Sequence, residues 1–237
     1  MTTPVRLAAI LDTETGGLDP AKHPCVEVAV TVYDLELAVP LASFSSLIQS
    51  ESNEAQEINR IPVDLLRSTL APPAEVVWRR VEAIIQDCDV FIAHRAEFDR
   101  SFTPEPIRSS RPWVCSKLAI EWPMGKYGDG LVHLALSHGV GVVNAHRAAT
   151  DVDILCRLLS RTHEILTNWT QARDGVRPLQ FMIERAMRPR RKLQALVSYE
   201  DREIAKAAGF QWEPAPAKRW VREAFFDQLF PFPTKEV

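Results

Sequence analysis

Near its amino terminus the chain reads Leu7-Ala8-Ala9-Ile10-Leu11-Asp12-Thr13-Glu14-Thr15-Gly16-Gly17-Leu18, an apolar run followed by two acids and a turn. The apolar part predicts a buried strand, where charge is costly unless it has a partner. Because residues i and i+2 of a strand project to the same face, Asp12 and Glu14 present two carboxylates side by side. Adjacent carboxylates repel each other, and a divalent cation bound through oxygen is the usual compensation. The stretch therefore predicts a metal site at the end of a core strand.

Length and composition are typical of a soluble globular protein. The 237 residues, 46% hydrophobic and 25% charged, suffice for one core of about 150 to 200 residues with a small appendage. No run approaches the roughly 20 apolar residues that cross a bilayer, and no signal peptide is recognisable, so no membrane partner is expected. Cys25, Cys88, Cys115 and Cys156 show no C-x-x-C spacing, which favours reduced thiols and a cytoplasmic location.

The order of the predicted elements, βββ-α-β-α-β-α, indicates one α/β domain with a mixed sheet over residues 5–168. After the first strand, the predicted strands are Cys25–Tyr33, Leu41–Ile48, Asp89–Ala93 and Trp113–Cys115. The predicted helices are Pro62–Leu70, one opened by Pro72-Pro73, Ser116–Glu121, Leu131–His138 and a long one from Ala145 to about Asn168. We take residues 1–170 as the main domain.

The chain changes character beyond Thr170. Residues 171–223 hold 12 Lys/Arg against 7 Asp/Glu, a local charge of +5 in a chain whose net charge is −3. We expect a basic linker and helix over 171–192, and a small β-α-β-β module over 193–237. The expected elements of the module are strand Leu193–Ser198, helix Tyr199–Ala208 and paired strands at Gly209–Trp212 and Lys218–Val221, with Trp212 and Trp220 in its core. The basic charge favours contact with nucleic acid or with a protein partner.

Two more acids could join the metal site. Asp99 follows the fourth predicted strand, and Asp151 lies on the last long helix, five residues after His146. Five residues on one helix would separate His146 and Asp151 by about 140° around its axis. The two can therefore share a site only if His146 lies in the loop before the helix begins.

Three motifs, in this order, resemble those of the DEDD exonucleases. They are Asp-x-Glu at 12–14, His-x-Ala-x-Phe-Asp at 94–99 and His-x-Ala-x-x-Asp at 146–151. The third motif is similar to that of the histidine (DEDDh) subclass, and Trp113–Ala119 with Trp122-Pro123 resembles the central segment of the bacterial exonuclease X family. The resemblance covers about residues 7–166. It implies a ribonuclease H-like fold, with a mixed five-stranded sheet flanked by helices.

The resemblance also implies the roles of individual residues. Of two Mg²⁺ or Mn²⁺ ions, one would be ligated by Asp12, Glu14 and Asp151, with Asp12 bridging to the second and Asp99 supporting the metals through water. His146 would be the general base, a role that suits a residue type which ionises near neutral pH. The pocket for the terminal nucleotide would be formed by Thr13, Thr15, Gly17, Leu18, His94 and Phe98.

Two residues depart from the family pattern. Arg95 stands where the family often has Asn, and Asn59 stands where many relatives carry His. Neither is a metal ligand in the resemblance. The departures therefore bear on substrate preference rather than on hydrolysis.

Taken together, these features predict a metal-dependent 3′-to-5′ exodeoxyribonuclease of DNA repair or replication. It would release nucleoside 5′-monophosphates, preferentially from single-stranded DNA ends. One alternative is a 3′-5′ exoribonuclease of the ribonuclease T or oligoribonuclease kind, and the discriminator is whether the pocket near Leu18 and Glu14 accepts a 2′-hydroxyl. Another is a proofreading or recruitment subunit of a replication or repair complex, contacted through the C-terminal module. Whether the chain forms a homodimer stays open.

Overall fold

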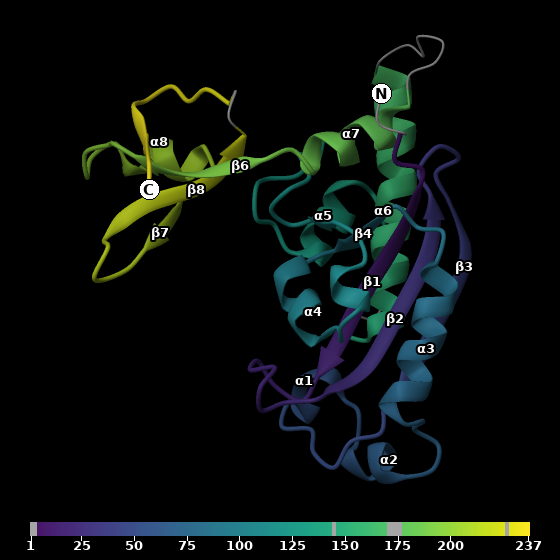
Figure 1. Cartoon of the computed structure of the whole chain (residues 1–237). Coiled ribbons are helices and arrows are strands. Elements are labelled where there is room, and N and C mark those ends of the chain that lie inside the picture. The colour runs from purple at the N-terminus through teal and green to yellow at the C-terminus, as the bar shows by residue number, and fades with distance from the viewer. Residues whose placement is uncertain (1–3, 144–145, 170–176, 226–227) are drawn as a thin grey trace. The chain divides into compact units, whose positions relative to one another are not determined.

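The computed structural model describes residues 4–143, 146–169, 177–225 and 228–237 (Figure 1). The chain forms two compact units. The first consists of Met1–Gly125 and Asp129–Met187, and the second of Lys126–Gly128 and Arg188–Val237. In the described part of the chain, no helix is both long enough and apolar enough to cross a membrane.

A five-stranded sheet forms the centre of the first unit, in the order β3-β2-β1-β4-β5. Its strands are β1 (Leu7–Thr15), β2 (Cys25–Asp34), β3 (Val39–Leu47), β4 (Val90–Ala93) and β5 (Trp113–Cys115). Strand β2 pairs antiparallel with both β1 and β3, whereas β1, β4 and β5 run parallel. The predicted mixed α/β sheet is therefore confirmed.

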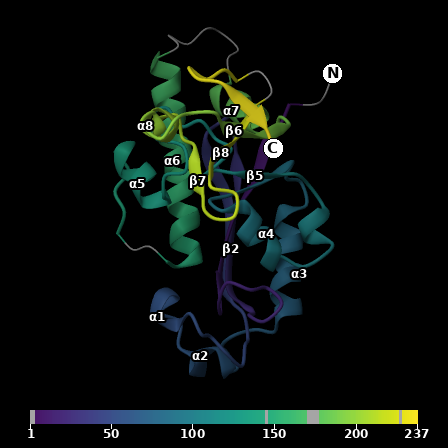
Figure 2. The same cartoon turned by 90° about the vertical axis from the view of Figure 1, so that its left-hand side faces the viewer.

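Helices cover both faces of this sheet, and two views place α3 and α6 on opposite sides of it (Figures 1 and 2). Helix α3 packs on one face, and α5, α6 and α7 pack into the cluster on the other. The bounds of these four are α3 (Ala74–Ile85), α5 (Leu131–Ser137), α6 (Ala148–Trp169) and α7 (Pro178–Ala186). The short helices are α1 (Gln56–Asn59), α2 (Val63–Arg67), α4 (Ala96–Phe102) and a 3₁₀ turn at Ile107–Ser109.

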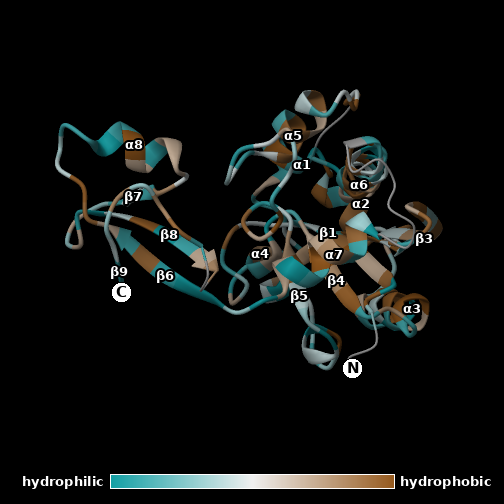
Figure 3. Cartoon of the chain, turned by 90° about the horizontal axis from the view of Figure 1, so that it is seen from above, coloured by the Kyte–Doolittle hydropathy of each residue, from teal (hydrophilic) through white to brown (hydrophobic). Residues whose placement is uncertain are grey.

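The alternation of side chains along β1 decides which face carries the acids. Ala8 and Ile10 pack into the core cluster that contains α6, whereas Ala9 and Leu11 pack with α3. Hydrophobic residues accordingly gather on β1, β4 and α3 (Figure 3). Because the period of a strand is two, Asp12 and Glu14 continue the row of Ala8 and Ile10 on the face covered by α6. The ladder between β1 and β2 shifts register immediately after Glu14.

One predicted helix is absent, and the short helices α1 and α4 were not predicted. Residues 116–119 form a turn rather than the start of a helix over Ser116–Glu121. The backbone N–H of Ser116 donates to the Ala93 carbonyl at 2.8 Å, and the Ser116 carbonyl accepts the Trp122 indole N–H at 2.7 Å, so this residue extends the sheet edge instead. Helix α4 occupies the segment after β4, where the sequence showed only a group of polar residues.

The second unit contains a four-stranded antiparallel sheet in the order β7-β8-β6-β9, together with one helix. Its elements are β6 (Arg190–Ala195), α8 (Arg202–Ala207), β7 (Gln211–Glu213), β8 (Arg219–Phe225) and β9 (Thr234–Glu236). The predicted β-α-β-β order is present, and β9 adds a further strand. The core consists of Leu193, Ala195, Ala205, Phe210 and Ala224.

Two predictions for this part of the chain were wrong. Strand β6 begins at Arg190, inside the stretch predicted to be a linker, because its basic residues pair along β8 and Arg190 lies over the Phe225 ring at 4.3 Å. Trp212 is 48% exposed rather than a core residue, with its ring centroid 5.5 Å from that of the partly buried Trp220. Part of the predicted linker, residues 171–176, lies outside the described residues.

Candidate active site

The acids predicted to act together converge on one edge of the five-stranded sheet. Asp12 and Glu14 lie at the carboxyl end of β1, and Asp99 lies in α4, directly after β4. Since β1 and β4 are parallel, their carboxyl ends reach the same edge. Asp151 lies in the first turn of α6, which packs on β1. Residues from three separate parts of the sequence thus meet at this edge.

Three of these acids form a candidate cation site. Asp12, Glu14 and Asp151 each offer one carboxylate oxygen, and the three atoms lie within 4.8 Å of one another. All three residues are half-buried, on a strand and a helix that belong to the core. An all-oxygen, carboxylate-rich donor set suits hard divalent cations such as Mg²⁺ and Mn²⁺. The residues present therefore fit the metal that the sequence predicted.

The raised pKa values of these carboxyl groups also favour a bound cation. Burial raises the pKa of Asp12 well above its ordinary value, and the neighbouring charges of Asp99 and Asp151 raise it further. Burial and the charge of Asp151 likewise raise the pKa of Glu14 to about 7. Burial is also the main cause of the raised pKa of Asp151. The folded protein therefore holds negative charges that repel one another, and a bound cation would relieve this repulsion.

Asp99 has a different place in the cluster. Its Oδ1 accepts hydrogen bonds from the Thr13 backbone N–H at 3.0 Å and from the Thr13 hydroxyl at 2.9 Å. The carboxyl group is buried, and burial raises its pKa to about 7 although these hydrogen bonds lower it. Asp99 is therefore held by β1 beside the three-oxygen group, not within it. This placement suits the supporting role that the sequence predicted.

His146 precedes α6, as a shared site with Asp151 requires. The described part of the helix begins at Ala148, and the expected start at Ala145 lies outside the described residues. The backbone of His146 has φ +68°, in the left-handed region that residues other than glycine rarely adopt. Its backbone N–H donates to Asp151 Oδ2 at 3.2 Å, and its side chain is exposed. The helix start thus joins His146 to a candidate metal ligand.

Two residues beside the site were missed from the sequence. The Arg147 guanidinium donates to both carboxylate oxygens of Glu27, at 3.0 and 2.7 Å. Glu27 lies on β2, directly opposite Glu14 in the ladder. The available signal was a single acid inside the otherwise apolar strand Cys25–Tyr33. Such an acid needs a cationic or hydrogen-bonding partner, and the sequence did not reveal which one.

The turn after β1 is held by a hydrogen bond within it and by a hydrogen bond from Asn59. The Thr15 hydroxyl donates to the Gly17 carbonyl at 2.7 Å, and the buried Asn59 amide donates to the Thr15 carbonyl at 3.2 Å. A Cβ atom on Gly17 would lie 2.6 Å from the His23 ring, so glycine permits this close approach. Leu18, at the tip, is 79% exposed. Of the predicted pocket residues, Leu18 is thus the most accessible. Thr13 and Thr15 are buried, and their hydrogen bonds hold Asp99 and the turn in place.

His94 and Phe98 follow β4 on the same edge. The His94 Nδ1 atom lies 3.0 Å from the Ser116 hydroxyl, and burial followed by the charge of Lys117 lowers the His94 pKa to about 4. This imidazole is therefore neutral at physiological pH. The ring of Phe98 lies 5.0 Å from that of Phe102, and the Arg95 guanidinium lies 5.5 Å from the Phe98 ring centre. Arg95 thus covers an aromatic residue of the predicted pocket.

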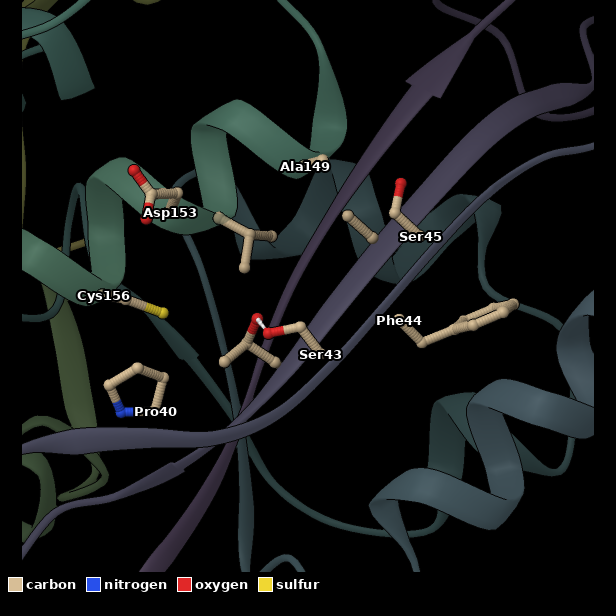
Figure 4. Close-up of a pocket in the computed structure, with 10 residues that line it drawn as sticks. Pro40, Ser43, Phe44, Ser45, Ala149, Asp153 and Cys156 are labelled. Atoms are coloured by element: carbon tan, nitrogen blue, oxygen red, sulfur yellow. Dashed lines mark hydrogen bonds between the residues drawn. The ribbon is translucent and has the colours of Figure 1, made fainter.

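A separate cavity of about 200 Å³ lies between α6 and strands β2 and β3 (Figure 4). Thr31 and Ser43 share a hydrogen bond of 2.8 Å in its lining, and Asp153 and Cys156 line it from α6. None of the candidate metal ligands lines this cavity. It is therefore distinct from the cluster of carboxylates.

The first unit has the ribonuclease H-like fold of known exonucleases. Escherichia coli exonuclease I in complex with a dT13 oligonucleotide is 16% identical, with a TM-score of 0.55 over 81% of this chain and 48% of that one. Exonuclease I from Methylocaldum szegediense is 21% identical, with a TM-score of 0.53 over 82% of this chain and 48% of that one. A 3′-exonuclease solved for its recognition of the histone mRNA stem-loop is 13% identical, with a TM-score of 0.54 over 69% of this chain and 84% of that one. The match thus spans about half the length of the exonuclease I structures.

Sequence comparisons add one match. Residues 191–235 match a family described as a domain of unknown function (DUF8626), which covers most of the second unit. No curated protein matches the chain.

The repulsion within the cluster predicts how stability depends on pH in metal-free protein. Glu14 and Asp99, with pKa values raised to about 7, keep protons in the folded state that the unfolded chain releases near pH 4. The free energy of unfolding therefore falls as pH rises from about 4 to 7, because the unfolded chain gives up these protons and the folded protein keeps them. Between pH 5 and pH 8 we expect the wild type to lose on the order of 1.5 kcal/mol more unfolding free energy than Glu14→Gln, both without metal. Its Tm should therefore fall by roughly 3–6 °C more than that of the variant.

The measurement is a pair of thermal melts in chelator and in Mn²⁺ across this pH range. Added Mn²⁺ should recover most of the loss in the wild type and little in Glu14→Gln. Equal pH slopes for the two proteins in chelator would contradict the assignment of the repulsion to this cluster.

Proposed function

We propose that this protein is a metal-dependent 3′-to-5′ exonuclease of the histidine (DEDDh) subclass, similar to exonuclease X, that acts on DNA. The observation that carries the proposal is the group of three carboxylate oxygens within 4.8 Å of one another, at the edge of a sheet with an exonuclease fold. His146 supports it, because its backbone N–H donates to Asp151 and its imidazole, a group able to accept a proton, lies near enough for its charge to lower the Asp151 pKa.

The proposal gives each side chain of the site a role. Asp12, Glu14 and Asp151 would hold the first of two Mg²⁺ or Mn²⁺ ions, and Asp99 would support the ions from beside this cluster. The ions would supply charge that stabilises both the attacking and the leaving oxygen of the phosphodiester. His146 takes the proton of the attacking water. The exposed Leu18 and the half-buried His94 and Phe98 contact the terminal nucleotide.

The preferred substrate in this proposal is a single-stranded DNA 3′ end. Exposed apolar contacts such as Leu18 suit an unpaired terminal base better than a paired one. The alternative of an exoribonuclease draws on the structural relative that recognises an mRNA stem-loop. The test compares single-stranded DNA, duplex DNA and RNA of one sequence, each labelled at its 5′ end, in Mg²⁺ and in Mn²⁺. Fastest shortening of single-stranded DNA is expected, and RNA shortened tenfold faster would favour the exoribonuclease.

We also propose that the second unit binds the nucleic acid strand. Its residues carry 11 Lys/Arg against 7 Asp/Glu, whereas the first unit carries 17 against 24. Trp212, half-exposed beside Trp220, offers a surface on which a base can stack. The opposing fact is that Glu213 already pairs with Lys192 and Arg219, which lowers the free positive charge. A replication or repair partner at this unit, and a homodimer, are the competing uses of its surface.

We expect Trp212→Ala to weaken binding of a single-stranded DNA oligonucleotide roughly 5- to 150-fold, since stacking of one base is worth about 1–3 kcal/mol. Binding is measured by fluorescence anisotropy in Ca²⁺, and the matched control is Tyr199→Ala, an exposed aromatic residue of the same unit. An unchanged affinity for Trp212→Ala would refute the strand-binding role. Capture of one stoichiometric protein partner by the wild type, with little activity of its own, would favour the recruitment reading.

A cytoplasmic location belongs to the same proposal. Cys25, Cys88, Cys115 and Cys156 are all free, as is usual for proteins of a reducing compartment. Labelling of the thiols in intact cells and after lysis would test it, and disulfide-bonded protein would contradict it.

A further inference from the structure

A buried carboxylate outside the predicted site joins β2 to the start of α6. Glu27 lies within the apolar strand β2, only 3% exposed, directly opposite Glu14. Its Oε2 accepts the backbone N–H of Ala148 at 3.1 Å, so it caps the first turn of α6. A carboxylate at a helix amino terminus also interacts favourably with the helix dipole. Glu27 therefore connects the strand beside Glu14 to the helix that carries Asp151.

Arg147 completes this connection. Its Nε and Nη2 atoms donate to the two oxygens of Glu27 at 3.0 and 2.7 Å, a bidentate geometry that fixes both direction and distance. Arg147 lies between His146 and Ala148, where the chain passes from a left-handed residue into the helix. The pair thus holds the segment in which His146 and Asp151 are joined by their hydrogen bond.

We propose that Glu27 and Arg147 are positioning residues, which set the start of α6 against β1 and thereby place Asp151 and His146 relative to Asp12 and Glu14. The inference deepens the proposed function and rests on it. Three contacts carry it: the ladder pairing of Glu27 with Glu14, the bidentate ion pair, and the cap on Ala148. Both residues act through others, because the three oxygens of the candidate cation site come from Asp12, Glu14 and Asp151.

Charge explains why the connection takes this form. Glu27 adds a further carboxylate beside a cluster that already repels itself, and Arg147 supplies the compensating positive charge. Removing Arg147 leaves the buried charge of Glu27 uncompensated, whereas removing both residues leaves no such charge. The loss of metal binding and kcat in the double variant should therefore be smaller than the product of the two single losses.

The same sheet provides a matched control. At the other end of β2, the buried Asp34 accepts hydrogen bonds from Nε and Nη2 of Arg6 at 3.3 and 3.2 Å. In both pairs the acid is almost fully buried and the arginine about half-exposed. Asp34 lies opposite Leu7, at the far end of β1 from Asp12. Asp34→Asn therefore removes a comparable ion pair without touching the site.

The experiment compares Glu27→Gln, Arg147→Met, the double variant and Asp34→Asn in the full chain. Melting curves first set a temperature at which every protein is folded. Mn²⁺ binding by calorimetry, and kcat and KM on single-stranded DNA, are then measured at that temperature. We expect each single variant to weaken Mn²⁺ binding and to lower kcat about 10- to 100-fold, the range for groups that orient metal ligands. KM for DNA should change less than about threefold, and the double variant should be no worse than the poorer single variant.

Two results would overturn the inference. One is Mn²⁺ binding and kcat in Glu27→Gln within twofold of Asp34→Asn. The other is a double variant whose loss equals the product of the single losses. A wild type that neither binds Mn²⁺ nor shortens DNA would instead overturn the proposed function, so the two failures are distinguishable.

Discussion

Asp12→Asn is expected to lower the kcat for shortening of single-stranded DNA by on the order of 10³-fold or more, equivalent to about 4 kcal/mol of transition-state stabilisation. The substitution keeps the size of the side chain and removes its charge. Asp12 has the charges of Asp99, Asp151 and Glu14 around it, so it is the acid on which the cluster centres. An amide at this point is a poorer ligand for a hard cation, and Mn²⁺ binding should weaken in parallel.

The same variant should be more stable than the wild type in chelator. Removal of a buried charge that repels its neighbours stabilises the folded state, at the expense of function. The control is Asp153→Asn, because Asp153 lies on the same helix as Asp151 but pairs with Arg157 and lines the separate cavity. Activity of Asp12→Asn within tenfold of that control would contradict the role of Asp12.

His146→Asn is expected to lower kcat about 10²- to 10⁴-fold, the usual contribution of a general base. Asparagine is chosen because it tolerates the left-handed backbone that this position adopts, and because it keeps the N–H that donates to Asp151. Mn²⁺ binding and the Tm should therefore stay close to those of the wild type. Loss of turnover with intact metal binding is what distinguishes a base from a ligand.

Single-turnover kinetics and Mn²⁺ calorimetry measure the two properties separately. His133→Asn is the control, since His133 is an exposed histidine on α5 whose neighbour is Asp129. A His146→Asn protein with kcat within threefold of the control would refute the assignment. Loss of Mn²⁺ binding would show that His146 acts through Asp151.

Much of the candidate site could be predicted because it depends on local periodicity. The alternation along β1 places Asp12 and Glu14 on one face, and the structure puts both on the face covered by α6. The angle between residues five apart on a helix required His146 to precede the helix, and it does. The convergence of Asp99 with these residues follows from the parallel pairing of β1 and β4. Short-range geometry thus sufficed wherever one element carried the residues.

What the sequence did not reveal depends on contacts between distant residues. Glu27 and Arg147 are 120 positions apart, and no local pattern indicates that they pair. The predicted helix at Ser116–Glu121 failed because the Trp122 indole takes the Ser116 carbonyl, which a helix would bond to the N–H four residues on. Trp212 was expected in a core, but a small sheet with one covering helix leaves it half-exposed. In each case tertiary contacts outweighed a local preference.

The most direct measurement of the central claim follows a single-stranded DNA oligonucleotide labelled at both ends, digested first in chelator and then after addition of Mn²⁺. A 3′-to-5′ exonuclease that binds its metal through Asp12, Glu14 and Asp151 should not hydrolyse the oligonucleotide in chelator. On addition of Mn²⁺ it should release the 3′-terminal label at once as a nucleoside 5′-monophosphate, while the 5′-labelled strand shortens one nucleotide at a time. Undiminished hydrolysis in chelator, or release of the 5′ label first, would contradict the proposed function.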